Sequence, residues 1–206
     1  MDRRNFLKTG GIALLGSLAT GSAMALTTPG ALGGEGADKK AAVALAMNHF
    51  GVSEADLKKV LAAALEKGGD YADLFFEHTI SNSIRLMDGA VNNSYSNIDY
   101  GVGVRVLTGD QSGYAYVENI TVEDMLKAAR TAARIASANK GNKPLNLTEK
   151  ELKKNYYTVA SPWEEVSLKD KMPYLQKLND RIFALDKRVH KVQASQSDTT
   201  SHIFFC

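Results

Sequence analysis

One stretch of the sequence decides the fold: GDYADLFFEHTISNSIRLMDGAVNNSYSNIDYGVGVRVLTGDQSGYAYVEN, residues 69–119. Near its end, small or charged residues alternate with a row of valines, Val102, Val104 and Val106. This period-2 pattern predicts a strand with one buried face. Asp88-Gly89 is a hairpin dipeptide, and Thr108-Gly109-Asp110 breaks the valine run before a tyrosine-containing strand. The stretch therefore predicts an antiparallel meander.

Amphipathic helices are predicted on both sides of this meander. Ser53 can cap a helix whose apolar side chains recur at helical spacing, Leu57, Val60, Leu61, Ala64 and Leu65. Thr121 can cap a second helix with a narrow, alanine-rich stripe. A shorter alanine-rich helix is predicted at 39–49. The predicted fold class is α+β, an antiparallel meander sheet flanked by helices.

Two glycines of the valine strand have two open interpretations. Gly101 and Gly103 can let another backbone approach closely, either an extended peptide or a partner's strand, with Arg105 next along the strand. Alternatively, they relieve crowding against the tyrosines of the next strand, Tyr114 and Tyr116. The polar segment 92–100 just before them is predicted to be a strand exposed on both faces, or a bent one.

The chain after the second helix changes character. Residues 141–162 are polar and contain two prolines, which predicts a linker with a short helical turn near 149–154. Ser167 then begins a helix, with Asp170 completing a capping-box pattern and Pro173 expected to bend or delay it. Residues 189–197 and 203–206 are predicted to be two strands joined by Asp198-Thr199-Thr200. The apolar ending Ile203–Cys206 suggests a truncated second segment of α+β structure.

The first 25 residues have the pattern of an export signal. Arg3 and Arg4 are followed by Phe6, Leu7 and Lys8, then by a mildly apolar run and a small-x-small cleavage pattern at Ala23 and Ala25. This predicts a twin-arginine signal and a periplasmic location. The apolar run is shorter than the roughly 20 residues of a membrane span, so no permanent membrane anchor is expected.

Composition restricts the class of protein further. The 206 residues allow one domain or one and a part, and the 44% hydrophobic content is enough for a core. The single cysteine, Cys206, cannot form an intrachain disulfide. The net charge of +2 is carried by the first eight residues, so a nucleic-acid partner is not expected.

The segments GGDYADLFFEH, SIRLMDG and DYGVGVRVLTGDQSGYAYVENIT resemble the N-terminal domain of the TldD/PmbA family, whose members are regarded as zinc metallopeptidases. The resemblance is most specific over residues 68–138. It implies proteolysis, zinc in the full-length protein, and a homodimer or a heterodimer with a family paralogue. In that family a His-Glu-x-x-x-His helix of the C-terminal half carries the metal.

The metal motif itself is not found in this sequence. Its histidines, His49, His78, His190 and His202, fall on four separate predicted elements, and Glu77-His78 lacks the second histidine that a zinc helix needs. We therefore expect neither a catalytic nor a metal-ligating residue within this chain, and no zinc bound by it alone.

Three functions stay open at this point. The chain is the substrate-entry or dimer-forming part of an exported peptidase that cleaves flexible peptides, a metal-free partner subunit of the same family, or an exported binding module. The predicted divisions are a signal at 1–25, a flexible leader and short helix at 26–52, the family-like domain at 53–140, the linker at 141–162, and the beginning of a second domain at 163–206.

Overall fold

The computed structural model describes residues 11–12, 37–136, 147–149 and 163–206. Its main elements, in chain order, are α2 (Ala37–Phe50), α3 (Glu54–Leu65), β2 (Tyr71–Met87), β3 (Ala90–Thr108), β4 (Gln111–Val117), α4 (Val122–Ala136), α5 (Leu168–Leu185) and β6 (Gln193–Phe205). Strands β1 (Gly11–Ile12) and β5 (Thr148–Glu149) form a small parallel pair, and η1 (Trp163–Glu165) is a 3-10 turn.

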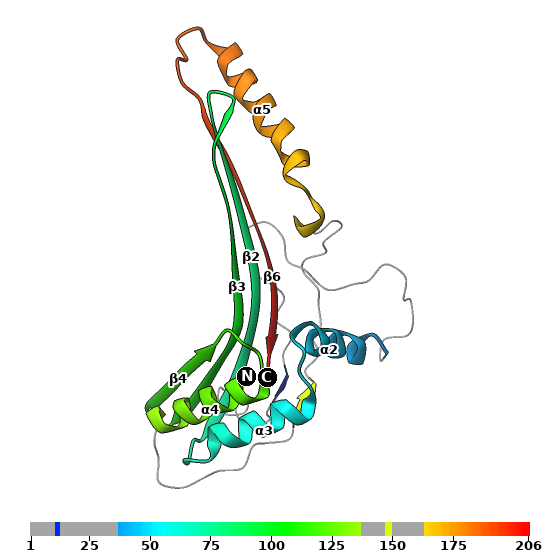
Figure 1. Ribbon diagram of the computed structural model, residues 1–206, viewed down its shortest axis with the longest axis vertical. Coiled ribbons are helices and arrows are strands. Elements are labelled where there is room, and N and C mark those ends of the chain that lie inside the picture. Colours follow the sequence, from blue (N-terminus) through cyan, green and yellow to red (C-terminus); the bar gives the residue numbers. More distant parts are fainter. Residues whose placement is uncertain (1–10, 13–36, 137–146, 150–162) are drawn as a thin grey trace, which may run out of the picture.

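The main sheet has four antiparallel strands in the order β4-β3-β2-β6. Figure 1 shows β2, β3 and β6 as long strands that run from a lower body, where α3 and α4 lie, to α5 at the far end. The predicted fold class, an α+β meander flanked by helices, is confirmed.

The predicted hairpin turn at Asp88-Gly89 is also confirmed. Both residues have positive φ, 51° at Asp88 and 80° at Gly89, as a two-residue turn of type I′ requires. The turn allows β2 and β3 to pair along nearly their whole length, from Tyr71 with Leu107 to Met87 with Ala90.

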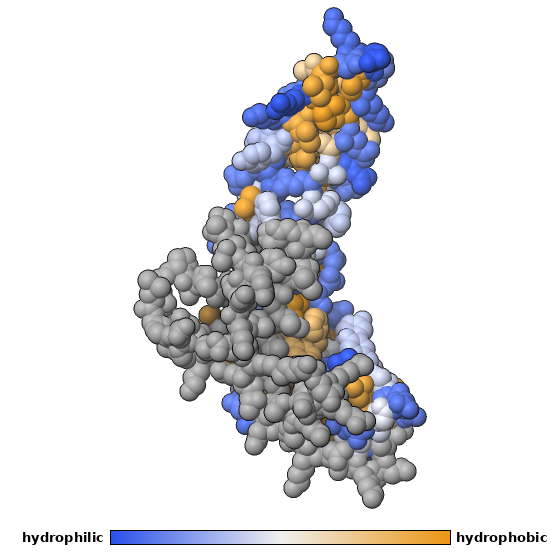
Figure 2. Space-filling model, turned by 180° about the vertical axis from the view of Figure 1, so that it is seen from behind, coloured by the Kyte–Doolittle hydropathy of each residue, from blue (hydrophilic) through white to orange (hydrophobic). Residues whose placement is uncertain are grey.

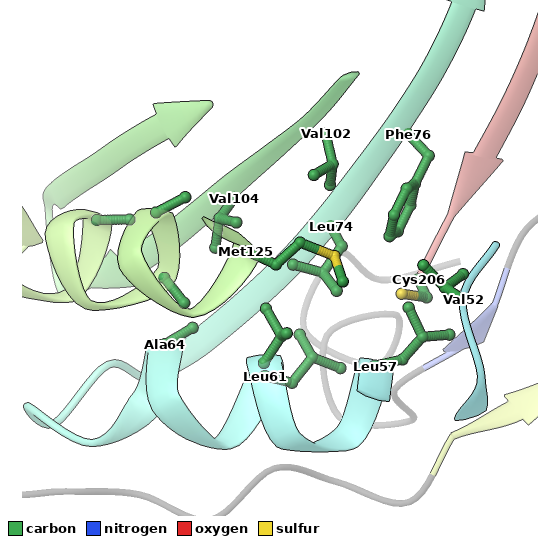
Figure 3. Close-up of a cluster of buried hydrophobic side chains, with 14 of the residues drawn as sticks. Val52, Leu57, Leu61, Ala64, Leu74, Phe76, Val102, Val104, Met125 and Cys206 are labelled. Atoms are coloured by element: carbon green, nitrogen blue, oxygen red, sulfur yellow. The ribbon is translucent and has the colours of Figure 1, made fainter. Parts of the chain in front are cut away.

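The main core lies between the lower half of the sheet and helices α3 and α4. The row of Val102, Val104 and Val106 is buried, as the alternation predicts. Figure 3 shows Met125 of α4 lying between the α3 side chains and Leu74 of β2. At the start of α3, Ser53 and Asp56 form a capping box, which satisfies backbone donors that a helix end leaves free.

Strand β6 differs from the prediction. The segments 189–197 and 203–206, with a turn at 198–200, were predicted as two strands, but Gln193–Phe205 is one continuous strand paired with β2. The polar residues that resemble a turn are paired across the sheet instead. Asn82 donates to Asp198, at Nδ2–Oδ1 3.0 Å, and the hydroxyls of Ser81 and Thr199 are 3.3 Å apart.

The far end of the sheet is covered by α5. Leu175 packs there against Ile84, Leu86 and Ala194 in a second, smaller core. Seen from behind, apolar residues gather at this end of the molecule (Figure 2). The capping box of Ser167 and Asp170 is present, and the helix begins before Pro173, so the proline does not delay it. None of the described helices is long and apolar enough to cross a membrane.

Some sequence predictions fall on other parts of the chain. The export-motif residues 3–8, the cleavage residues Ala23 and Ala25, and most of the linker 141–162 lie outside the described residues. The boundary predicted at residue 163 stays a prediction, although β6 shares the sheet with β2 and places Phe204 in the main core.

Candidate functional site at the edge of β3

A groove of about 650 Å³ lies where β4 ends beside β3. It includes Gly101 and Gly103, the two glycines singled out by the sequence. Its lining residues are Phe75, Glu77, Ile98, Asp99, Tyr100, Gly101, Val102, Gly103, Tyr114, Tyr116, Glu118 and Asn119.

The groove follows a strand edge. Strand β4 pairs with β3 only from Val102 to Thr108, whereas β3 continues to Ala90. Among the described residues, β3 therefore has a partner on one side only over residues 90–101. The groove is lined by residues 98–103, which are consecutive and face both sides of the sheet. Its lining side chains from β2 and β4, Phe75, Glu77, Tyr114 and Tyr116, lie on one face of the sheet, opposite the buried valine row. The groove therefore lies on this outer face and reaches the open strand edge beside residues 98–101.

The space above both glycines is filled by atoms of the same sheet. A Cβ on Gly103 would lie 2.8 Å from Cε2 of Tyr114, and one on Gly101 would lie 2.5 Å from the Val117 carbonyl oxygen. Real Cβ atoms are not found so close to other heavy atoms. These contacts support the crowding interpretation for the glycines, so any bound peptide would lie along the edge and not on top of them.

Arg105 is held away from the groove by Asp73. Its Nε donates to Asp73 Oδ2 at 2.9 Å, and a second guanidinium nitrogen contacts the same oxygen. Burial raises the pKa of the Asp73 carboxyl, because lost hydration opposes ionisation more than the Arg105 guanidinium favours it. The same carboxylate raises the pKa of Arg105. The guanidinium of Arg105 is therefore engaged in an ion pair with Asp73.

The charged residues that line the groove are all acidic. The carboxylate of Glu77 accepts a hydrogen bond from the Thr79 hydroxyl at 2.7 Å, and Asp99 accepts one from Asn97 Nδ2 at 3.0 Å. Glu118 lies where the chain leaves β4. Tyr114 and Tyr116 stand beside them and are 56% and 65% exposed. The groove thus combines aromatic walls with negative charge.

The fold brings together three histidines that lie far apart in the sequence. His78 of β2 and His202 of β6 are direct register partners, and His49 of α2 lies against both. His49 Nε2 and His78 Nδ1 are 2.9 Å apart, and the rings of His49 and His202 stack at 4.4 Å. Sequence reasoning missed this cluster, because only the register of β6 on β2 reveals it.

This histidine cluster does not fit a zinc site. A metal needs nitrogen lone pairs directed at a common point, whereas the rings of His49 and His202 stack on each other and the facing nitrogens of His49 and His78 form a hydrogen bond. Within the described parts of the chain, no group of three or more His, Cys, Asp or Glu residues is arranged to hold a metal ion.

A second cavity, of about 430 Å³, lies between the far half of the sheet, η1 and the start of α5. Trp163, Tyr95 and Ile80 are among its walls. Its only basic lining residue, Lys171, is paired with Asp198 at 2.7 Å and lies 5.4 Å from the centre of the Trp163 ring. This lysine anchors α5 to the sheet and is not available to a ligand.

Comparison with known proteins shows that the central part of the chain is similar to one domain of a metallopeptidase family. Residues 72–136, from β2 to the end of α4, match the family model described as PmbA/TldA metallopeptidase domain 1. This match covers the hairpin, β4 and the groove, and it supports the TldD/PmbA resemblance for this domain.

Individual relatives agree with the family model. The chain is 30% identical over 138 residues to a metalloprotease TldD homolog of Haemophilus influenzae, covering 65% of this chain and 28% of that protein. It is 27% identical over 157 residues to a metalloprotease TldD homolog of Buchnera aphidicola, covering 76% and 32%. The chain thus spans about a third of the length of the curated relatives it matches.

A solved structure shows the same fold. It comes from Bacteroides thetaiotaomicron, and its name connects it with modulation of DNA gyrase. The TM-score is 0.58 at 13% identity, over 74% of this chain and 36% of that one.

Proposed function

We propose that this chain is the N-terminal scaffold of an exported, TldD/PmbA-like zinc metallopeptidase that hydrolyses flexible peptides, and that the groove beside β3 belongs to its substrate entry. The observation that carries the proposal is the match of residues 72–136 to the first domain of that metallopeptidase family. The groove lies inside the matched residues and follows an accessible strand edge.

Zinc is proposed for the full-length protein and not for the residues described. The histidine cluster does not have the geometry of a metal site, and the chain spans only about a third of its curated relatives. The hydrolytic centre would therefore be supplied by a part of the protein outside this chain. We therefore propose that this chain contributes by positioning the peptide substrate.

The direct test uses the full-length gene product. We expect zinc in purified protein, cleavage of an unfolded substrate such as reduced casein, and loss of cleavage with a chelator. A metal-free product with no cleavage would overturn the peptidase assignment. A stop codon directly after Cys206 would leave a binding module as the function.

A second candidate is a metal-free partner subunit of the same family. The observation that favours it is the same accessible edge of β3, since a strand from another subunit can pair there. The continuing reading frame separates the two candidates. A His-Glu-x-x-x-His sequence supports the peptidase, and a long continuation without it supports the partner subunit. In either case a homodimer or a heterodimer is proposed.

Export is proposed from Arg3 and Arg4 and from the cleavage pattern that ends at Ala25. Replacing both arginines by lysine should retain the protein in the cytoplasm, whereas the unchanged protein should be recovered from the periplasm without its first 25 residues. Unchanged recovery of the double variant would exclude the twin-arginine route.

A further inference from the structure

Among the residues that the structure describes, no strand pairs with the outer edge of β3 between Asn93 and Tyr100. Residues 90–100 are all exposed, and β4 covers the strand only from Val102 onward. Proteins normally protect such edges with proline, lysine or short strands, because an open edge pairs with other chains. The segment 93–100, NSYSNIDY, contains no proline, and Asp99 is its only charge.

The alternation of hydrogen bonds shows which groups face this edge. Thr108 and Gln111 flank a two-residue turn, and such a turn closes with a hydrogen-bonded pair. Even-numbered residues of β3 therefore bond toward β4 and odd-numbered ones toward β2, which agrees with the bond from the Asp70 N–H to the Leu107 carbonyl. The register with β2 is continuous from Asn93 to Leu107.

It follows that the even-numbered residues direct their N–H and C=O groups toward the open edge. These are Ser94, Ser96, Ile98 and Tyr100. Their N–H and C=O groups are the donors and acceptors with which an added strand would pair. Such a strand would lie beside β3 beyond the end of β4, in the same line as β4.

The charge at this position favours a basic strand. A strand that continues the line of β4 would place alternate side chains on the face that carries Tyr114 and Tyr116. There they would lie near Glu77, Asp99 and Glu118, and the residues that line the groove include no lysine, arginine or histidine. Because carboxylates attract cations and aromatic faces also favour them, a lysine or arginine side chain fits this place.

We infer that an extended peptide segment carrying a lysine or arginine adds to the sheet as an antiparallel or parallel strand along Ser94–Tyr100, with its basic side chain in the acidic groove. The inference rests on the proposed function, because it names the class of peptide that the substrate-entry surface accepts. Main-chain hydrogen bonds would supply sequence-independent binding, and the groove would supply the preference for a basic residue.

The test measures binding of short fluorescent peptides to the full chain, without any cleavage. The probes alternate threonine and valine and differ only at one central residue, which is lysine, glutamine or glutamate. We expect the lysine peptide to bind about threefold or more tightly than the glutamine peptide, and the glutamate peptide to bind most weakly. The preference should shrink in high salt, because the charges are exposed.

Two variants test main-chain pairing at the strand edge and charge attraction in the groove separately. Ser96→Pro removes an N–H that faces the open edge without touching the ladder to β2, so it should abolish binding of all peptides, whereas the control Ser96→Thr should not. The double variant Asp99→Asn with Glu118→Gln should reduce the preference for lysine, since only Glu77 remains, and should retain binding. The double variant Glu66→Gln with Glu165→Gln, at two exposed carboxylates that do not line the groove, is the matched charge control.

Equal binding of the lysine and glutamate peptides would refute the preference for a basic residue. Undiminished binding to a folded Ser96→Pro variant would refute the addition of a strand along the edge of β3. Self-association of the chain that peptide cannot displace would show that a second copy occupies the edge instead. This test measures neither zinc nor cleavage. A negative result would therefore refute the peptide-binding inference but not the metallopeptidase proposal, which the zinc and cleavage experiment tests.

Discussion

Lys171 of α5 and Asp198 of β6 form an ion pair at the far end of the sheet. Their Nζ and Oδ2 atoms are 2.7 Å apart, and the two side chains are 5% and 3% exposed. Asn82 of β2 donates to the second oxygen of the same carboxylate. The pair joins the helix to the edge strand β6, and a small apolar core around Leu175 adds to the contact between α5 and the sheet.

Replacing one member of this pair should release α5. Lys171→Met leaves Asp198 buried without its cation, and breaking a buried pair in this way costs about 3–5 kcal/mol. We expect loss of protection in α5 by amide hydrogen exchange, with the lower body retained. Lys169→Met, on the exposed side of the same helix, is the control. The double variant Lys171→Met with Asp198→Leu should regain most of the protection, and if it does not, the ion pair is not what holds the helix.

Gly113 of β4 lies directly against helix α4. A Cβ at this position would overlap the Ala132 carbonyl oxygen and lie 2.8 Å from the Ala136 backbone nitrogen. Backbone atoms cannot rotate away as a side chain can, so Gly113→Ala should lower the free energy of unfolding by about 2–3 kcal/mol. Urea unfolding measures this loss. Ser112→Ala, at the exposed neighbour, should change stability by less than about 0.5 kcal/mol. Similar values for both variants would contradict the close packing of α4 on β4.

Gly103 and Tyr114 should be energetically coupled. Gly103→Ala forces the exposed tyrosine ring to move, which should cost about 1 kcal/mol. In a Tyr114→Ala background the space is free and the cost should fall close to zero. The double-mutant cycle measures this coupling. An undiminished cost without the tyrosine ring would mean that the glycine is needed for another reason, such as a backbone that approaches from outside.

Sequence reasoning predicted the parts of this molecule that depend on local patterns. The valine row, the Asp88-Gly89 turn and the Ser53 cap each depend on a few neighbouring residues, and all three are present. The error in β6 arose because Asp198 and the threonines beside it resemble a turn when read locally. They are strand residues since β2 provides their partners more than a hundred positions earlier.

The candidate site was only partly predictable for the same reason. Gly101 and Gly103 were identified from the sequence, but the open edge beside them exists because β4 is shorter than β3. No local pattern reports where a neighbouring strand ends. The meeting of His49, His78 and His202 likewise depends on the pairing of β6 with β2 and on the position of α2.

Alkaline pH should destabilise the lower body through the partly buried Tyr71 and the buried Cys206. Burial, with Asp73 nearby, raises the pKa of Tyr71 from 10.0 to about 12 and that of the Cys206 thiol from 9.0 to about 12. Because both pKa values are higher in the folded protein, the unfolded chain loses these protons first as the pH rises. Stability is therefore complete below pH 9 and falls between pH 9 and 12.

Urea unfolding at a series of pH values checks this prediction. Tyr71 is only partly buried, so its share of the loss should be about 1 kcal/mol, and the buried thiol should contribute more. Tyr71→Phe should remove the smaller part of the decrease in unfolding free energy between pH 9 and 12. Tyr71→Phe with Cys206→Ala should make the unfolding free energy nearly independent of pH over this range. The slope with pH is the measured quantity, because Cys206→Ala also removes core contacts at every pH. A slope that persists in the double variant would show that other groups govern the alkaline limit.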